Sequence, residues 1–105
     1  MLEGDYKTEL VKKIEERLPG SLVLKNDCNY RQGIPDLTVL YKDRWGFLEV
    51  KTSAKAKKQP NQDWYIDQAS ADSFGAFIYP ENEEEVLREL QHSFESDRTA
   101  RLSRR

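Results

Sequence analysis

Two short segments in the middle of the chain constrain its fold more than any other feature. Residues 33–41 (GIPDLTVLY) and 47–51 (FLEVK) are rich in β-branched, aromatic and aliphatic side chains. Segments of this composition and length are typical of β-strands, with Gly33 and Pro35 at the start of the first. The residues between the segments include Asp43, Arg44 and Gly46, and so short a connection predicts an antiparallel hairpin.

The second segment carries charged residues in a setting that is otherwise apolar. Glu49 and Lys51 are two positions apart, so their side chains lie on the same face of a strand. Burying a charge is costly unless the charge is paired or bound to a metal. If Thr38 lies opposite Glu49 in the hairpin, Asp36 lies opposite Lys51, and three charged groups converge on one point.

The rest of the chain supplies helices and further strands around this hairpin. Apolar residues recur every four positions in a helix predicted over 5–18, as Tyr6, Leu10, Ile14 and Leu18. The other predicted elements are a strand within 21–28, a helix from 60 to about 72, a strand over 75–79 and a helix from 82 to about 94. We expect Trp64 to pack inward from the second helix and Cys28 to be a partly buried strand residue. The order α-β-β-β-α-β-α predicts an α/β fold with a mixed central sheet and a C-terminal helix.

Length and composition indicate one domain with a polar surface. The chain has 105 residues, of which 37% are hydrophobic and 34% charged. We place the domain at residues 1–95 and a basic tail at 96–105. The formal net charge is −2, so contacts with nucleic acid must come from local basic clusters. The single cysteine excludes an internal disulfide and a multi-cysteine zinc site. No signal peptide or membrane-length apolar run is visible, so we expect a cytoplasmic protein without membrane contact.

The hairpin residues carry a resemblance to known nucleases. Pro35-Asp36 followed by Glu49-Val50-Lys51 resembles the PD-(D/E)xK signature of metal-dependent nucleases. With GIPDL at 33–37 and a glutamine on the next helix, the pattern is most similar to VRR-NUC domains, and it also resembles archaeal Holliday-junction resolvases. The resemblance implies a restriction-endonuclease-like αβββαβ core, which agrees with the element order predicted above.

The same resemblance implies a metal site on the hairpin. Asp36 and Glu49 would anchor Mg²⁺ or Mn²⁺, with the backbone carbonyl of Val50 as a further ligand. A divalent ion bound by oxygens can activate water and neutralise charge during phosphodiester hydrolysis. Lys51 would orient or deprotonate the water, or stabilise the developing charge, and the sequence does not choose between these roles. The plainer alternative is a cross-strand salt bridge from Lys51 to Asp36 or Glu49.

Two helices offer further candidates for the site. Glu9, Glu15 and Glu16 lie on the first predicted helix, and the helical wheel does not choose among them. The resolvase-like pattern of Glu followed by two apolar residues matches Glu9, so the resemblance implies Glu9 as a catalytic and metal-binding residue. On the second helix Gln62 matches the family glutamine that helps hold the metal-bound water. Gln59 and Gln68 are the competing positions.

Basic and aromatic residues near the hairpin are candidates for contact with DNA. Lys55, Lys57 and Lys58 follow the second strand with no acidic residue among them. Arg31 precedes the first strand, and Tyr30 beside it can stack on an exposed base or ribose. Such residues hold the phosphate backbone rather than read base edges. We therefore expect recognition of DNA structure rather than of DNA sequence.

The resemblance implies a DNA endonuclease that acts as a homodimer on branched DNA such as Holliday junctions. Two alternatives stay open at this point. One is a nicking or flap nuclease of DNA repair. The other is a catalytically silent nuclease fold that serves as a DNA-binding or scaffold subunit.

Overall fold

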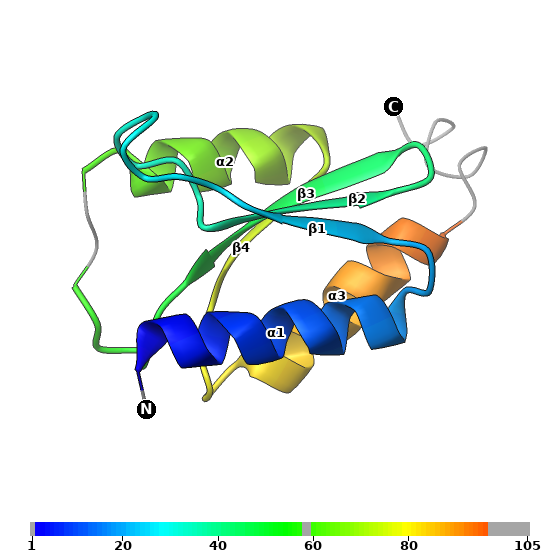
Figure 1. Ribbon diagram of the computed structural model, residues 1–105. Coiled ribbons are helices and arrows are strands. Elements are labelled where there is room, and N and C mark those ends of the chain that lie inside the picture. Colours follow the sequence, from blue (N-terminus) through cyan, green and yellow to red (C-terminus); the bar gives the residue numbers. More distant parts are fainter. Residues whose placement is uncertain (1, 58–59, 97–105) are drawn as a thin grey trace.

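The structure, a computed structural model, describes residues 2–57 and 60–96. Its elements follow the predicted order α-β-β-β-α-β-α (Figure 1). They are α1 (Glu3–Arg17), β1 (Leu22–Lys25), β2 (Leu37–Tyr41), β3 (Arg44–Val50), α2 (Gln62–Asp72), β4 (Phe74–Ile78) and α3 (Glu83–Glu95). The predicted basic tail lies outside the described residues apart from Ser96. None of the helices in the described part of the chain is both long and apolar enough to cross a bilayer.

The four strands form one mixed sheet, as predicted, and their order in it is β1-β2-β3-β4. β1, β2 and β3 pair antiparallel, whereas β3 and β4 pair parallel. Parallel neighbours need a crossover connection, and α2 provides it. α1 and α3 cover one face of the sheet, and α2 lies on the other face over β3 and β4 (Figure 1).

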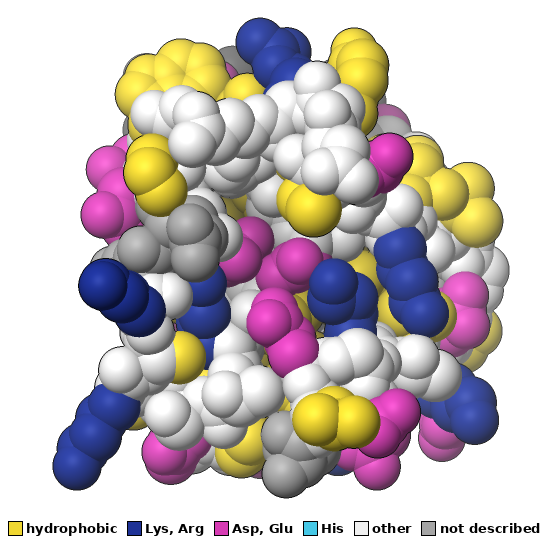
Figure 2. All heavy atoms as spheres, turned by 60° about the vertical axis from the view of Figure 1, so that its left-hand side comes forward, with side chains coloured by type: hydrophobic (Ala, Val, Ile, Leu, Met, Phe, Trp, Pro, Cys, Tyr) yellow, Lys and Arg dark blue, Asp and Glu magenta, His cyan; other side chains and the backbone are white. Residues whose placement is uncertain are grey.

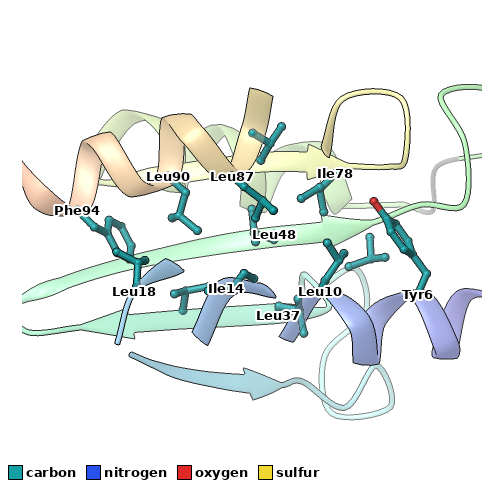
Figure 3. Packing of buried hydrophobic residues seen from close by; sticks show 13 residues of the cluster. Tyr6, Leu10, Ile14, Leu18, Leu37, Leu48, Ile78, Leu87, Leu90 and Phe94 are labelled. Carbon is teal, nitrogen blue, oxygen red and sulfur yellow. The ribbon is translucent and has the colours of Figure 1, made fainter. Parts of the chain in front are cut away.

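The hydrophobic core lies between the sheet and the pair α1 and α3. All four residues of the predicted stripe on α1 are buried, and Leu10 and Ile14 have no exposed surface. They pack on strand residues such as Leu48 and on Leu87 and Leu90 of α3 (Figure 3). Packing in this layer sets the position of the first turn of α1 relative to the ends of the central strands. Side chains from these elements can therefore meet at that end of the sheet.

The hairpin has a different register from the one supposed above. Its turn is only Lys42 and Asp43, and Thr38 pairs with Phe47 rather than with Glu49. One step beyond the last paired residues, Asp36 therefore lies beside Glu49, and its backbone N–H donates to Glu49 Oε1 at 3.2 Å. The three charged residues still share one side of the sheet, but the acids are neighbours and Lys51 lies beyond them.

Two expectations for single residues are wrong. Cys28 is exposed in a turn, because β1 ends at Lys25 and the chain then leaves the sheet. Trp64 is 59% exposed. Gln62, at the first position of α2, is buried and faces the sheet. Trp64 lies two positions later and therefore points away from the sheet.

Candidate functional site

A cleft of about 440 Å³ opens at the end of the sheet where β2 begins and β3 ends. The first residues of α1 and of α2 both reach this cleft. Its walls are formed by Glu3, Gly4, Lys7, Cys28, Asp36, Glu49, Lys51, Thr52, Ala56, Lys57 and Gln62. Figure 2 looks toward this end of the molecule and shows acidic side chains gathered in the middle of the face, with basic side chains beside them.

The cleft balances acidic against basic groups. Two helix N-termini add partial positive charge, which favours anions such as phosphate. The lining contains the three carboxylates of Glu3, Asp36 and Glu49 and the three ammonium groups of Lys7, Lys51 and Lys57. One bound divalent cation would therefore make the lining positive, as a site for a polyanion requires.

Asp36 is held by donors on both of its carboxylate oxygens. Oδ2 accepts from the Val50 backbone N–H at 2.9 Å, and Oδ1 accepts from Lys7 Nζ at 3.0 Å. The first contact comes from the neighbouring strand and the second from α1. Asp36 and Val50 are thus in contact, but Val50 makes the contact with its N–H and not with the carbonyl that the resemblance implies as a metal ligand.

Glu49 is the most deeply buried acid of the cleft, with only 3% of its surface exposed. Its Oε2 accepts from Gln62 Nε2 at 2.6 Å and lies 3.4 Å from Lys51 Nζ. Burial, and next the nearby Asp36 carboxylate, raise the pKa of Glu49 to about 8. Near neutral pH the acid pair therefore resists carrying two negative charges, and a divalent cation would favour the doubly ionised form.

Lys51 lies in the cleft on the same side as Glu49. The Lys51 ammonium group also donates to the backbone carbonyl of Lys57 at 3.2 Å, so two contacts fix its position at the mouth of the acid pair. The salt bridge considered above as the plainer alternative is therefore present, between Lys51 and Glu49. It coexists with the convergence of the acids, because all of these groups line one cleft.

The donor atoms of this cleft fit a hard divalent cation better than zinc. Among residues 2–57 and 60–96 no group of three or more His, Cys, Asp or Glu side chains is placed to hold a metal ion, so a site here has two carboxylate ligands at most. Mg²⁺ keeps several waters and usually takes one or two protein carboxylates together with substrate phosphates. The two carboxylates of Asp36 and Glu49 meet that requirement.

The first helix contributes residues other than those predicted. Glu9, Glu15 and Glu16 are exposed on α1 and do not line the cleft. α1 begins at Glu3, earlier than expected, and the start of the helix rather than its middle reaches the acids. Glu3 and Lys7 are four residues apart on one side of the helix, and that spacing was the available sequence signal.

The other predicted residues separate into two groups. Gln62 is buried against Glu49, whereas its competitor Gln68 is exposed on α2. Of the predicted DNA contacts, Lys57 lines the cleft, while Tyr30, Arg31 and Lys55 are exposed outside its lining. Gln59 and Lys58 lie outside the described residues.

Comparison with known proteins agrees with this architecture. A solved structure described as a VRR_NUC domain superposes with a TM-score of 0.62 at 25% sequence identity, over 86% of this chain and 95% of the other. No protein-family model and no curated protein matches the sequence. The resemblance stated from GIPDL and Glu49-Val50-Lys51 is thereby confirmed at the level of the fold, and the chain has a VRR-NUC nuclease fold.

Proposed function

We propose that this domain of VRR-NUC fold is a divalent-metal-dependent endonuclease that hydrolyses phosphodiester bonds in branched DNA such as Holliday junctions. The observation that carries the proposal is the meeting of Asp36, Glu49, Lys51 and Gln62 in one open cleft. An ordinary structural salt bridge has no need of a second, partly buried acid or of a buried glutamine beside it.

The residues of the cleft fit distinct steps of phosphodiester hydrolysis. Mg²⁺ or Mn²⁺ held by Asp36, Glu49 and the Val50 carbonyl would act as a Lewis acid and lower the pKa of an attacking water. Gln62 fixes the orientation of the Glu49 carboxylate through its 2.6 Å hydrogen bond. Lys51, at 3.4 Å from the same carboxylate, is placed to orient the water or to stabilise negative charge that develops on the phosphate.

The surroundings of the acid pair suit a nucleic-acid backbone. The N-termini of α1 and α2 and the ammonium group of Lys57 border the cleft and favour phosphate. Tyr30 and Arg31 are exposed on the connection between β1 and β2, and we keep them as candidate DNA contacts outside the cleft. In place of Glu9, we assign the carboxylate from the first helix to Glu3, because Glu3 lines the cleft.

Cleavage of supercoiled plasmid with Mg²⁺ or Mn²⁺ tests the activity. Asp36→Asn and Lys51→Met should each lower the rate by at least about a hundredfold, because each removes a group next to the scissile phosphate. Asp67→Asn and Lys12→Met are matched controls, since both residues are exposed on helices outside the cleft. Equal loss in the controls would show that the effect is not specific to the cleft.

The choice of DNA substrate separates the proposal from its alternatives. Four-way junctions, flaps, nicked duplexes and single strands of matched sequence should be compared at equal concentration. Preference for the flap or nicked duplex would indicate a repair nuclease. DNA binding without cleavage of any substrate, with either metal, would indicate a scaffold subunit.

The uncovered part of the α2 face supports the proposed homodimer. Leu22 and Leu24 of β1 and Leu40 of β2 are exposed there, and pairing of Leu22 with Leu40 makes them one continuous apolar strip. Such a strip suits an isologous contact with a second copy, and two copies supply the two cuts that a four-way junction needs. Sedimentation of the wild type and of Leu24→Glu tests this, and a wild type that stays monomeric at high concentration would contradict it.

A further inference from the structure

The contact between Lys7 and Asp36 joins the two parts of the cleft that come from different layers. Lys7 extends from α1, its side chain is 22% exposed, and its Nζ lies 3.0 Å from Asp36 Oδ1. The other oxygen of Asp36 is taken by the Val50 N–H. Oδ1 of Asp36 faces α1, and a cation from solution therefore competes with Lys7 for this oxygen.

An ammonium group and a divalent ion cannot share that oxygen without strong repulsion. A divalent ion bound to a carboxylate lies within about 2.6 Å of the oxygen, close to the position that the ammonium group holds. Two cations at such a separation repel each other, and the partly buried setting screens the repulsion poorly. The carboxylate of Asp36 therefore favours one cation at a time on this side.

Lys7 has an alternative place to go. It lines the cleft next to Glu3 and Gly4, and Gly4 has no side chain to fill the space beside it. The flexible four-carbon stem of lysine allows its ammonium group to turn from Asp36 toward the open volume of the cleft. In the proposed function that volume receives a phosphate, for which a mobile ammonium group is a suitable partner.

We propose that Lys7 occupies Asp36 in the metal-free protein, is displaced by the divalent cation, and then binds the DNA phosphate in the cleft. The inference rests on the proposed function, since it assumes a metal and a phosphate in this cleft. Its consequence is that metal loading and DNA binding are linked through one side chain. Lys7 is a positioning residue before metal binds and a substrate contact afterwards.

Binding of Mn²⁺ to the metal-free protein, measured by calorimetry without DNA, tests the first half. Lys7→Met keeps the length of the side chain and removes its charge, so Mn²⁺ should bind about five- to tenfold more tightly. Lys7→Arg keeps the charge and should stay within about twofold of the wild type, and Lys12→Met should leave the affinity unchanged. Unchanged or weaker binding in Lys7→Met overturns the inference.

Binding of junction DNA in Ca²⁺, with Asp36 left unchanged so that its contact with Lys7 is the native one, tests the second half. The slope of log affinity against log salt should fall by about one in Lys7→Met, because one phosphate contact is lost. An unchanged slope overturns the phosphate contact. Should Lys7→Met fail to fold by circular dichroism, Lys7→Gln takes its place in both measurements.

The outcomes also separate this inference from the proposed function. If the wild type and Lys7→Met both fail to bind Mn²⁺, the proposed metal site itself is wrong. If the wild type binds Mn²⁺ and Lys7→Met binds it no more tightly, only the role of Lys7 is wrong, and its contact with Asp36 is a structural ion pair.

Discussion

The two faces of the sheet are built on opposite rules. The face under α1 and α3 is closed and apolar, and residues such as Leu10 and Leu48 have no exposed surface there. The face under α2 buries Glu49 of β3 against Gln62 and leaves Leu24 of the edge strand β1 41% exposed. Stability is therefore concentrated in one layer and chemistry in the other, and substitutions on the two faces should differ in kind.

The substitution Glu49→Gln, on the α2 face, should have the largest effect, on activity and not on the fold. It removes a proposed metal ligand but keeps the size of the side chain, so cleavage should fall by about a thousandfold or more and Mn²⁺ binding should be lost. The fold should persist, because glutamine is uncharged like the protonated form of Glu49 that burial favours. Plasmid cleavage, calorimetry with Mn²⁺ and thermal melting give the three readouts.

Glu15→Gln is the matched control, since Glu15 is exposed on α1 away from the cleft. It should cleave DNA and bind Mn²⁺ as the wild type does. Undiminished Mn²⁺ affinity in Glu49→Gln would remove this residue from the metal site.

Truncation of one leucine on each face should give the next largest difference. Leu48→Ala opens a cavity in the closed layer and should lower the free energy of unfolding by about 2–5 kcal/mol. Leu24→Ala, on the uncovered strip, should lower it by less than about 1 kcal/mol in the monomer. Denaturant unfolding at low protein concentration measures both, and similar losses would mean that the α2 face is as closed as the other.

The closed face was predictable from the sequence because it follows helical and strand periodicity. The stripe on α1 and the alternation in the hairpin define it without knowledge of the other elements. The hairpin register was harder, because Arg44 looks like a turn residue in the sequence. In the structure Arg44 is buried in β3 and donates to backbone carbonyls of Ser93 and Ser96, at the far end of α3.

The cleft was predictable only in the part that comes from neighbouring strands. Asp36, Glu49 and Lys51 are close in the sheet, and Gln62 follows from the resemblance. Which residues of α1 reach the cleft depends on where the helix begins relative to the strand ends. Packing of α1 on the closed face of the sheet sets that position. For that reason the sequence pattern points to Glu9, whereas the structure places Glu3 and Lys7 in the cleft.

The pH dependence of stability should sharpen the contrast further. Glu49 has a pKa of about 8 in the folded chain against an ordinary value of 4.5, so the folded state keeps a proton that the unfolded state loses. The stabilising contribution is therefore complete below about pH 4.5 and is lost as pH rises toward 8. We expect a loss of the order of 1–3 kcal/mol in the metal-free protein, measured by denaturant unfolding.

Glu49→Gln should lack this part of the pH dependence, and Mn²⁺ should stabilise the wild type more at pH 8 than at pH 6. The second effect follows because metal and proton compete for the same carboxylate. A wild type and a Glu49→Gln variant with the same pH profile would show that Glu49 does not titrate in this range.

The smallest expected effect concerns two lysines that the sequence could not tell apart. Lys57 lines the cleft and Lys55 does not. In a Glu49→Gln background that binds DNA without cutting it, Lys57→Gln should lower the slope of log affinity against log salt by about one, whereas Lys55→Gln should change it by less than about half as much. The Lys57 carbonyl that accepts from Lys51 belongs to the backbone, so the substitution leaves that contact in place. Fluorescence anisotropy with labelled junction DNA measures both slopes. An unaltered slope in Lys57→Gln would show that Lys57 does not contact the DNA.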